Sequence, residues 1–185
     1  MFFSLGSRWI FSDKLIRRFK GNLVNFHGAR LPQDAGGGLF SWRIMKNDRI
    51  NLLLIHKVTK QINKGPILTY EEKLFPKSCK LPIDFKINCD EGFLSLYKKF
   101  IEDIKIKKKF YFKNQPQYLS SYYPRLDSRS DSWLDWSMTA NEIERFIDAF
   151  DDPFKGCLTK IGSKIVRLKK AQLHSGETSS HSYMK

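Results

Sequence analysis

Two side chains suited to chemistry, Asn25 and His27, follow a short apolar run that begins with Leu23-Val24 and predicts a strand. Because alternate residues of a strand point to the same side of a sheet, the amide and the imidazole are expected on one face. An amide donates hydrogen bonds, and an imidazole exchanges protons near neutral pH. Open α/β sheets bind their ligands where strands end, so we expect a ligand beside this pair.

The neighbouring elements supply the frame for this pair. Pro32 and the triple glycine at 36–38 predict a loop that faces it, followed by a helix over 39–46. A second strand is expected over 51–58, and His56 inside this apolar run is interpreted as a core histidine. The glycines favour either a close approach of the backbone to a ligand or a plain flexible turn, and both interpretations stay open.

The stretch Asn25-Phe26-His27-Gly28-Ala29-Arg30-Leu31-Pro32 resembles the Asn-x-His-x-x-x-Leu-Pro signature of the tetrahydrofolate-dependent formyltransferases. This family includes methionyl-tRNA formyltransferases and nucleotide-amino-sugar N-formyltransferases. Further segments that fit the family in the same order are Trp42, Asn47-Asp48, His56-Lys57-Val58, Ile62–Leu68, Asp131–Trp136 and Ile147–Phe150. The resemblance covers most of the chain and is specific for the family, but it is weak for the acceptor substrate.

The resemblance implies an α/β fold, namely the C-terminal half of a Rossmann-like formyltransferase domain with a small C-terminal extension. We expect a partial catalytic domain over 1–110, a linker helix and the start of the extension over 111–173, and a disordered tail over 174–185. The family normally has a further half-sheet before this part. Its absence would expose an apolar sheet edge, which indicates a truncated product, a partial gene model, or a remnant that needs a second copy or a complementing chain.

The resemblance also implies the reaction, which is transfer of a formyl group from 10-formyltetrahydrofolate to a primary amine. Asn25 would donate a hydrogen bond to the developing oxyanion, and His27 would stabilise that charge or shuttle protons. The third catalytic position of the family is Asn63 in this sequence. The folate pocket is expected to use the segment 4–10 and the loop 61–65, through Ser4, Gly6, Ile10, Gln61, Ile62 and Gly65.

Asn63 stands where the family has an aspartate that orients the imidazole. An asparagine carries no charge and its amide favours a different imidazole tautomer, so slow or absent catalysis is expected. Asp34 or Asp48 could replace the carboxylate only if folding brought one of them near His27. The alternative function is therefore a catalytically impaired remnant that binds folate or a protein partner.

The acceptor amine is expected on a nucleotide sugar or on methionyl-tRNA. Gly28-Ala29-Arg30 and the triple glycine at 36–38 differ from the small-residue-rich Ser-Leu-Leu-Pro form common in the tRNA enzymes, which slightly favours an amino sugar. The net charge of +14 suits an anionic substrate, although a lysine-rich genome explains it equally well. A third interpretation, an RNA-binding protein, depends on this charge and on the aromatic residues between 107 and 130.

The composition favours a cytoplasmic protein. At 185 residues, of which 41% are hydrophobic, the chain can bury one core. No apolar run approaches the ~20 residues of a membrane span. Cys79, Cys89 and Cys157 lack metal-ligand spacing and are interpreted as reduced thiols. No metal site is expected.

The remaining elements are expected from periodicity and capping signals. Ser12 would cap a helix over 13–19 with Leu15, Ile16 and Phe19 inward. The stretch 69–90 reads as irregular, and Asp90 would cap a helix over 91–105. The inner face of that helix would be Phe93, Leu94, Tyr97, Phe100, Ile101 and Ile104. Residues 107–130 read as a linker, Thr139 opens a helix with a capping box, and 164–168 alternates like a strand.

Overall fold

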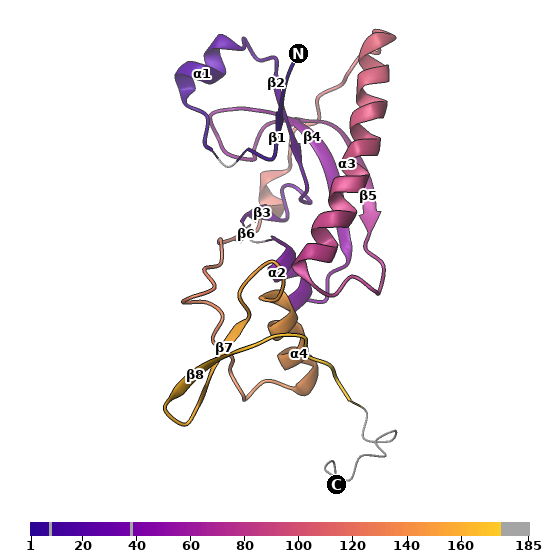
Figure 1. The fold of residues 1–185 in the computed structure, drawn as a ribbon. Coiled ribbons are helices and arrows are strands. Elements are labelled where there is room, and N and C mark those ends of the chain that lie inside the picture. Colours follow the sequence, from indigo (N-terminus) through magenta and orange to yellow (C-terminus); the bar gives the residue numbers. More distant parts are fainter. Residues whose placement is uncertain (8, 38, 175–185) are drawn as a thin grey trace. The chain divides into compact units, whose positions relative to one another are not determined.

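The computed structural model describes residues 1–7, 9–37 and 39–174, which separate into two units (Figure 1). Unit 1 comprises Met1–Leu39, Arg49–Cys79 and Asp84–Arg125. Unit 2 comprises Phe40–Asp48, Lys80–Ile83 and the chain from Leu126 on. Arg8, Gly38 and the tail 175–185 lie outside the described residues, so the expectation of a disordered tail is not addressed there.

Unit 1 is built on a four-stranded sheet in the order β1 (Phe2–Leu5), β2 (Leu23–His27), β4 (Ile50–Lys57) and β5 (Ile67–Leu74). β1 runs parallel to β2, whereas β4 is antiparallel to both of its neighbours. The expected α/β class is confirmed, as are the strands over 23–27 and 51–58 to within one residue. The edge strand β1 exposes apolar side chains, among them Phe2 and Leu5.

One face of this sheet packs against α3 (Pro82–Lys105), which runs beside β4 and β5 (Figure 1). Phe3 of β1 and Phe26 of β2 both make edge-on contacts with Phe100 of α3, with ring centroids 6.1 and 6.0 Å apart. Phe26 also contacts Phe93 and Tyr97. Because Phe26 points to this face, its neighbours Asn25 and His27 are directed to the opposite one, as predicted.

Two expectations for the middle of the chain are wrong. The stretch 69–90 is not irregular, because β5 occupies its first part and α3 begins at Pro82, eight residues before Asp90. The charges of Glu71, Glu72 and Lys73 hide the strand, since an edge strand keeps one polar face. Proline at the first position of a helix was the missed start signal.

The packing faces of two helices also differ from expectation. In α3, Leu94 is exposed, whereas Leu96, which was not predicted, is buried. α1 (Asp13–Arg18) is capped by Ser12 as predicted, with the Leu15 amide donating to Ser12 Oγ at 3.3 Å. Leu15 itself is exposed, and α1 has no buried residue.

Residues 107–125 of the stretch interpreted as a linker belong to unit 1. We call residues 107–125 the strap; it contains the 3-10 turn η1 (Gln117–Leu119) and β6 (Tyr122–Tyr123), which pairs in parallel with β3 (Ala35–Gly36). Gly36 has φ +115°, and a Cβ there would lie 1.9 Å from the carbonyl oxygen of Tyr123. Close contact with the strap therefore requires this glycine.

Unit 2 contains most of α2 (Leu39–Met45), together with α4 (Ala140–Ala149) and a hairpin of β7 (Cys157–Ile161) and β8 (Lys164–Leu168). The capping box of Thr139 and Glu142 is confirmed, and the helix ends at Ala149. The hydroxyl of Ser41 in α2 donates to the carbonyl oxygen of Ala149 at 2.7 Å. β8 was predicted, whereas β7 was not.

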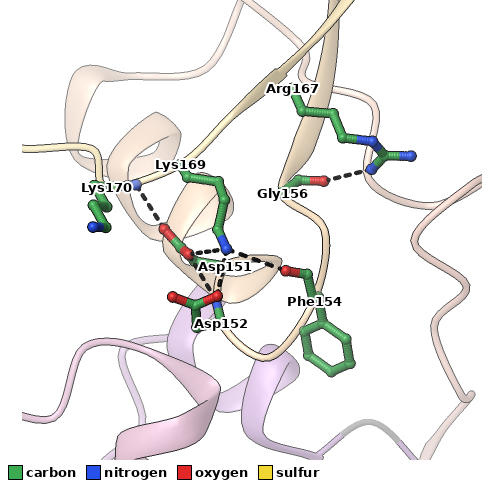
Figure 2. A network of polar contacts seen from close by, with 7 residues as sticks. All are labelled: Asp151, Asp152, Phe154, Gly156, Arg167, Lys169 and Lys170. Carbon is green, nitrogen blue, oxygen red and sulfur yellow. Dashed lines mark hydrogen bonds and ion pairs between the residues drawn. The ribbon is translucent and has the colours of Figure 1, made fainter.

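The carboxylate of Asp151 joins the end of α4 to the end of β8 (Figure 2). It accepts hydrogen bonds from the backbone amides of Asp152 and Lys170, each at 2.6 Å, and pairs with Lys169 Nζ at 3.1 Å. Burial alone would raise the pKa of this carboxyl, but these bonds outweigh it and hold the pKa below its ordinary value.

Replacing Asp151 with alanine is expected to lower the free energy of unfolding by about 3 kcal/mol, because buried donors and a cation lose their partner. Urea denaturation followed by tryptophan fluorescence measures this. The matched control is Asp152→Ala, whose half-exposed carboxylate also pairs with Lys169 and should cost less than about 1 kcal/mol. Equal losses in the two variants would contradict the role assigned to Asp151.

Among the described residues, no helix is long and apolar enough to cross a membrane. The same part of the chain holds no group of three or more His, Cys, Asp or Glu side chains that could bind a metal ion. The interpretation of the cysteines as thiols agrees with the structure, in which Cys79, Cys89 and Cys157 are buried and none forms a disulfide with another described residue.

Candidate functional site

A cavity of about 280 Å³ lies in unit 1, on the sheet face that carries Asn25 and His27. Its walls come from the segment after β1, from α1, from β2 and from the end of β4 with the loop that follows. The lining residues are Ser7, Trp9, Ile10, Phe11, Ile16, Asn25, His27, Gly36, His56 and residues 58–63. Polar groups of the strands thus meet an apolar wall from the N-terminal segment.

The three residues predicted to be catalytic, Asn25, His27 and Asn63, all line this cavity. Of the six predicted folate residues, Ile10, Gln61 and Ile62 line it as well. Ser4, Gly6 and Gly65 are not among its lining residues. Gly65, at the end of the loop, lies against the end of β4, where a Cβ would be 1.8 Å from the carbonyl oxygen of Lys57.

Asn25 is held by His56, which lies directly opposite on the antiparallel strand β4. His56 Nδ1 lies 3.0 Å from the carbonyl oxygen of Lys57, which can only accept, so Nδ1 carries the proton. Nε2 is then an acceptor for Asn25 Nδ2 at 3.3 Å. This contact orients the amide of Asn25, whose second N–H has no hydrogen-bond partner among the described residues and can donate to a ligand.

His56 is therefore more than the core histidine that the sequence suggests. It is buried and hydrogen-bonded, as expected of a core residue, yet it also lines the cavity. An antiparallel register between the strands over 23–27 and 51–58 would have placed His56 opposite Asn25, and cross-strand partners share a face of the sheet. The apolar run around it concealed this role.

His27 lies beside His56, with ring centroids 5.8 Å apart and ring planes near perpendicular. Its Nε2 is buried and has no hydrogen-bond partner among the described residues. Burial, and then repulsion by His56, lowers the pKa of His27 from 6.5 to about 3. At neutral pH this imidazole is uncharged.

This low pKa predicts acid instability that depends on His27. Below pH 6.5 the unfolded chain binds a proton at this residue that the folded chain does not bind until about pH 3. Stability should therefore fall with pH in this window, by about 3 kcal/mol between pH 6.5 and pH 4 at ~1.4 kcal/mol per unit. Urea unfolding of the wild type and of His27→Gln at several pH values measures it. The variant's curve should be flatter by this amount, and parallel curves would contradict the prediction.

Asn63 has φ +58°, a left-handed conformation that asparagine and aspartate adopt more easily than most residues. The two carboxylates considered as replacements are engaged elsewhere. Asp34 pairs with Arg30 at 3.3 Å and Asp48 pairs with Arg43 at 3.3 Å. The cavity therefore has no carboxylate among its lining residues in the described part of the chain.

Comparison with known proteins finds similarity to formyltransferases, the family that the sequence motifs of the cavity residues resemble. Residues 128–183 match the model of the formyl transferase C-terminal domain. The chain is 26% identical over 172 residues to the bifunctional polymyxin resistance protein ArnA of Wigglesworthia glossinidia brevipalpis, covering 92% of this chain and 26% of that protein. It is 26% identical over 166 residues to a methionyl-tRNA formyltransferase of Treponema denticola, covering 89% of this chain and 50% of that protein.

The solved structures agree. An N-formyltransferase from Helicobacter canadensis, in complex with folinic acid and dTDP-3-aminofucose, superimposes with a TM-score of 0.68 at 25% identity. The match covers 80% of this chain and 54% of that chain. The chain is similar to formyltransferases in both sequence and structure. It spans half or less of the length of the two curated relatives described above, and the resemblance seen in its sequence motifs is confirmed.

Proposed function

We propose that this chain transfers a formyl group from 10-formyltetrahydrofolate to a primary amine. The observation that carries the proposal is that Asn25, His27 and Asn63 line one and the same cavity. Its rim is apolar and exposed, with Trp9 82%, Ile10 78% and Ile62 59% accessible. A flat heteroaromatic ring would cover such a rim, while the amide and imidazole inside would face the reacting group.

The cavity residues can be assigned to the steps of acyl transfer. The amine nitrogen attacks the formyl carbon, and the free N–H of Asn25 donates to the oxyanion that forms. Negative charge beside His27 raises its pKa, so the imidazole can take the proton that the amine loses. The C–N10 bond then breaks, N10 leaves with a proton, and the formamide product remains.

Asn63 makes the second candidate function specific. This second candidate is a catalytically impaired remnant that binds folate, without turning it over, or binds a protein partner. It fits a cavity that has no carboxylate among its described lining residues. A complementing chain or a second copy would pair along the exposed edge of β1. We propose a cytoplasmic location for both candidate functions, because the thiols of Cys79, Cys89 and Cys157 would stay reduced there.

The acceptor is proposed to be the amine of a nucleotide-linked sugar or of methionyl-tRNA, with the amino sugar favoured slightly by Gly28-Ala29-Arg30. The test is a formyl-transfer assay with each acceptor and 10-formyltetrahydrofolate, with the formamide detected by mass. A formamide that appears only with the folate supports the proposed function. Saturable folate binding with no product from either acceptor supports the impaired remnant instead.

A further inference from the structure

The buried side-chain amide of Gln115, in the strap, is directed at the loop at 61–65, which contributes to the wall of the cavity. The side chain is 7% exposed. Its Nε2 donates one hydrogen bond to the carbonyl oxygen of Asn63 at 2.8 Å and another to that of Gly65 at 2.7 Å. A single amide group thus joins two carbonyls of the loop at 61–65, using both of its N–H bonds.

Besides the contact of Gly65 with Lys57, few interactions with other described residues hold the loop at 61–65. Gln61 and Ile62 are exposed, so they contribute no core packing. Apart from Gln115, the loop backbone receives a bond from Thr59 Oγ1 to the carbonyl oxygen of Gln61 at 3.0 Å. It also has a long internal bond of 3.3 Å from the Lys64 amide to the Gln61 carbonyl. The conformation of a loop with so few contacts depends strongly on each one.

The strap presents Gln115 from a fixed position. Lys113 and Ile67 form an antiparallel bridge in which each backbone amide donates to the other residue's carbonyl oxygen at 2.8 Å. Ile67 opens β5 of the central sheet. The backbone is therefore hydrogen-bonded to the sheet at Lys113, two residues before Gln115. This anchor makes the side-chain amide of Gln115 a rigid support rather than a mobile contact.

The oxygen of the same amide has no partner. Oε1 of Gln115 is buried without a hydrogen bond from any described residue. An unsatisfied buried acceptor costs about as much as a hydrogen bond contributes. The net contribution of Gln115 to global stability is therefore small, and its clear effect is on the two carbonyls that its nitrogen binds.

We propose that Gln115 is a positioning residue that holds Asn63 and the folate-facing loop at 61–65 in the shape the cavity requires. The proposal rests on the proposed function only in taking that loop as a wall of the folate site. It makes the strap part of the site, although the strap contributes no cavity-lining residue in the described chain.

Hydrogen exchange tests this directly on the full chain. Gln115→Leu removes both donors at similar size, and Gln115→Glu places acceptors against two carbonyl oxygens. Both variants should speed exchange of the amides in 61–66 by about fivefold or more while β4 and β5 keep their wild-type rates. The matched control is Gln117→Leu, which alters an exposed amide in the same strap. Gln117 Nε2 donates a long bond of 3.5 Å to the backbone oxygen of Gln115, so its loss leaves both donors of the Gln115 side chain in place, and this variant should exchange like the wild type.

Titration with 5-formyltetrahydrofolate tests whether the conformation of the loop at 61–65 affects folate affinity. Gln115→Leu should weaken binding about tenfold, the expected worth of the two lost bonds, with Gln117→Leu unchanged. Unchanged exchange in 61–66, exchange that rises across the whole sheet, or faster loop exchange with unchanged folate affinity would each overturn the proposal. If the wild type binds no folate, the proposed function fails, and exchange alone then decides the role of Gln115.

Discussion

Asn63→Asp is expected to raise the rate of formyl transfer about a hundredfold or more. The substitution would place a carboxylate at the position where the resemblance to formyltransferases implies one that orients the imidazole. In a serine-protease triad the reverse change, from aspartate to asparagine, lowers turnover by about 10⁴. Aspartate also tolerates the left-handed backbone at this position, where φ is +58°. The bond from Gln115 is kept, because it ends on a backbone oxygen.

The matched control for this variant is Asn47→Asp. Asn47 also has positive φ, +53°, so the control adds the same charge on the same backbone conformation away from the cavity lining. Single-turnover formyl transfer with each acceptor, measured in parallel, compares the two variants. A gain in Asn63→Asp alone supports the assignment of this position. Equal rates in the two variants and the wild type, with folate bound tightly, would favour the impaired remnant.

Asn25→Leu, made in the Asn63→Asp background, is expected to lower the rate of formyl transfer by about 10²–10³, the usual effect of losing one oxyanion donor. Leucine keeps the volume of the side chain while removing the N–H that His56 orients. Because the donor acts in the transition state, the turnover number should fall while the affinity for 5-formyltetrahydrofolate changes little.

The control for Asn25→Leu is Asn22→Leu, which alters an exposed amide just before the same strand and should leave turnover unchanged. A parallel loss of folate affinity and turnover in Asn25→Leu would contradict the role of an oxyanion donor. It would assign Asn25 to substrate binding or to the packing around His56.

Much of the fold could be predicted, because in many segments the local sequence signals, such as helix caps and strand alternation, agree with the tertiary packing. Thr139 and Glu142 cap α4 as their spacing indicates, and Asn25 and His27 share a sheet face because strands alternate. β5 was missed because its exposed face carries charge, so composition outweighed alternation. The start of α3 was missed because Asp90 resembles a cap, whereas Pro82 opens the helix.

The site was predictable only in part, for a different reason. The motif positions predict Asn25, His27 and Asn63, but contacts between residues far apart in the sequence leave no local pattern from which they could be predicted. The support of Asn25 by His56 depends on strand register, and the support of the loop by Gln115 joins residues about fifty positions apart. The low pKa of His27 likewise arises from burial that only the folded unit provides.

The central claim is that the cavity of unit 1 binds a formyl folate, and calorimetric titration of the full chain with 5-formyltetrahydrofolate tests it most directly. We expect saturable binding of one molecule per chain, weakened about tenfold or more in Ile62→Asp by loss of an apolar wall. Ile106→Asp, at an exposed isoleucine away from the cavity lining, should bind like the wild type. Absence of binding to the wild type, or equal binding by the two variants, would contradict the claim.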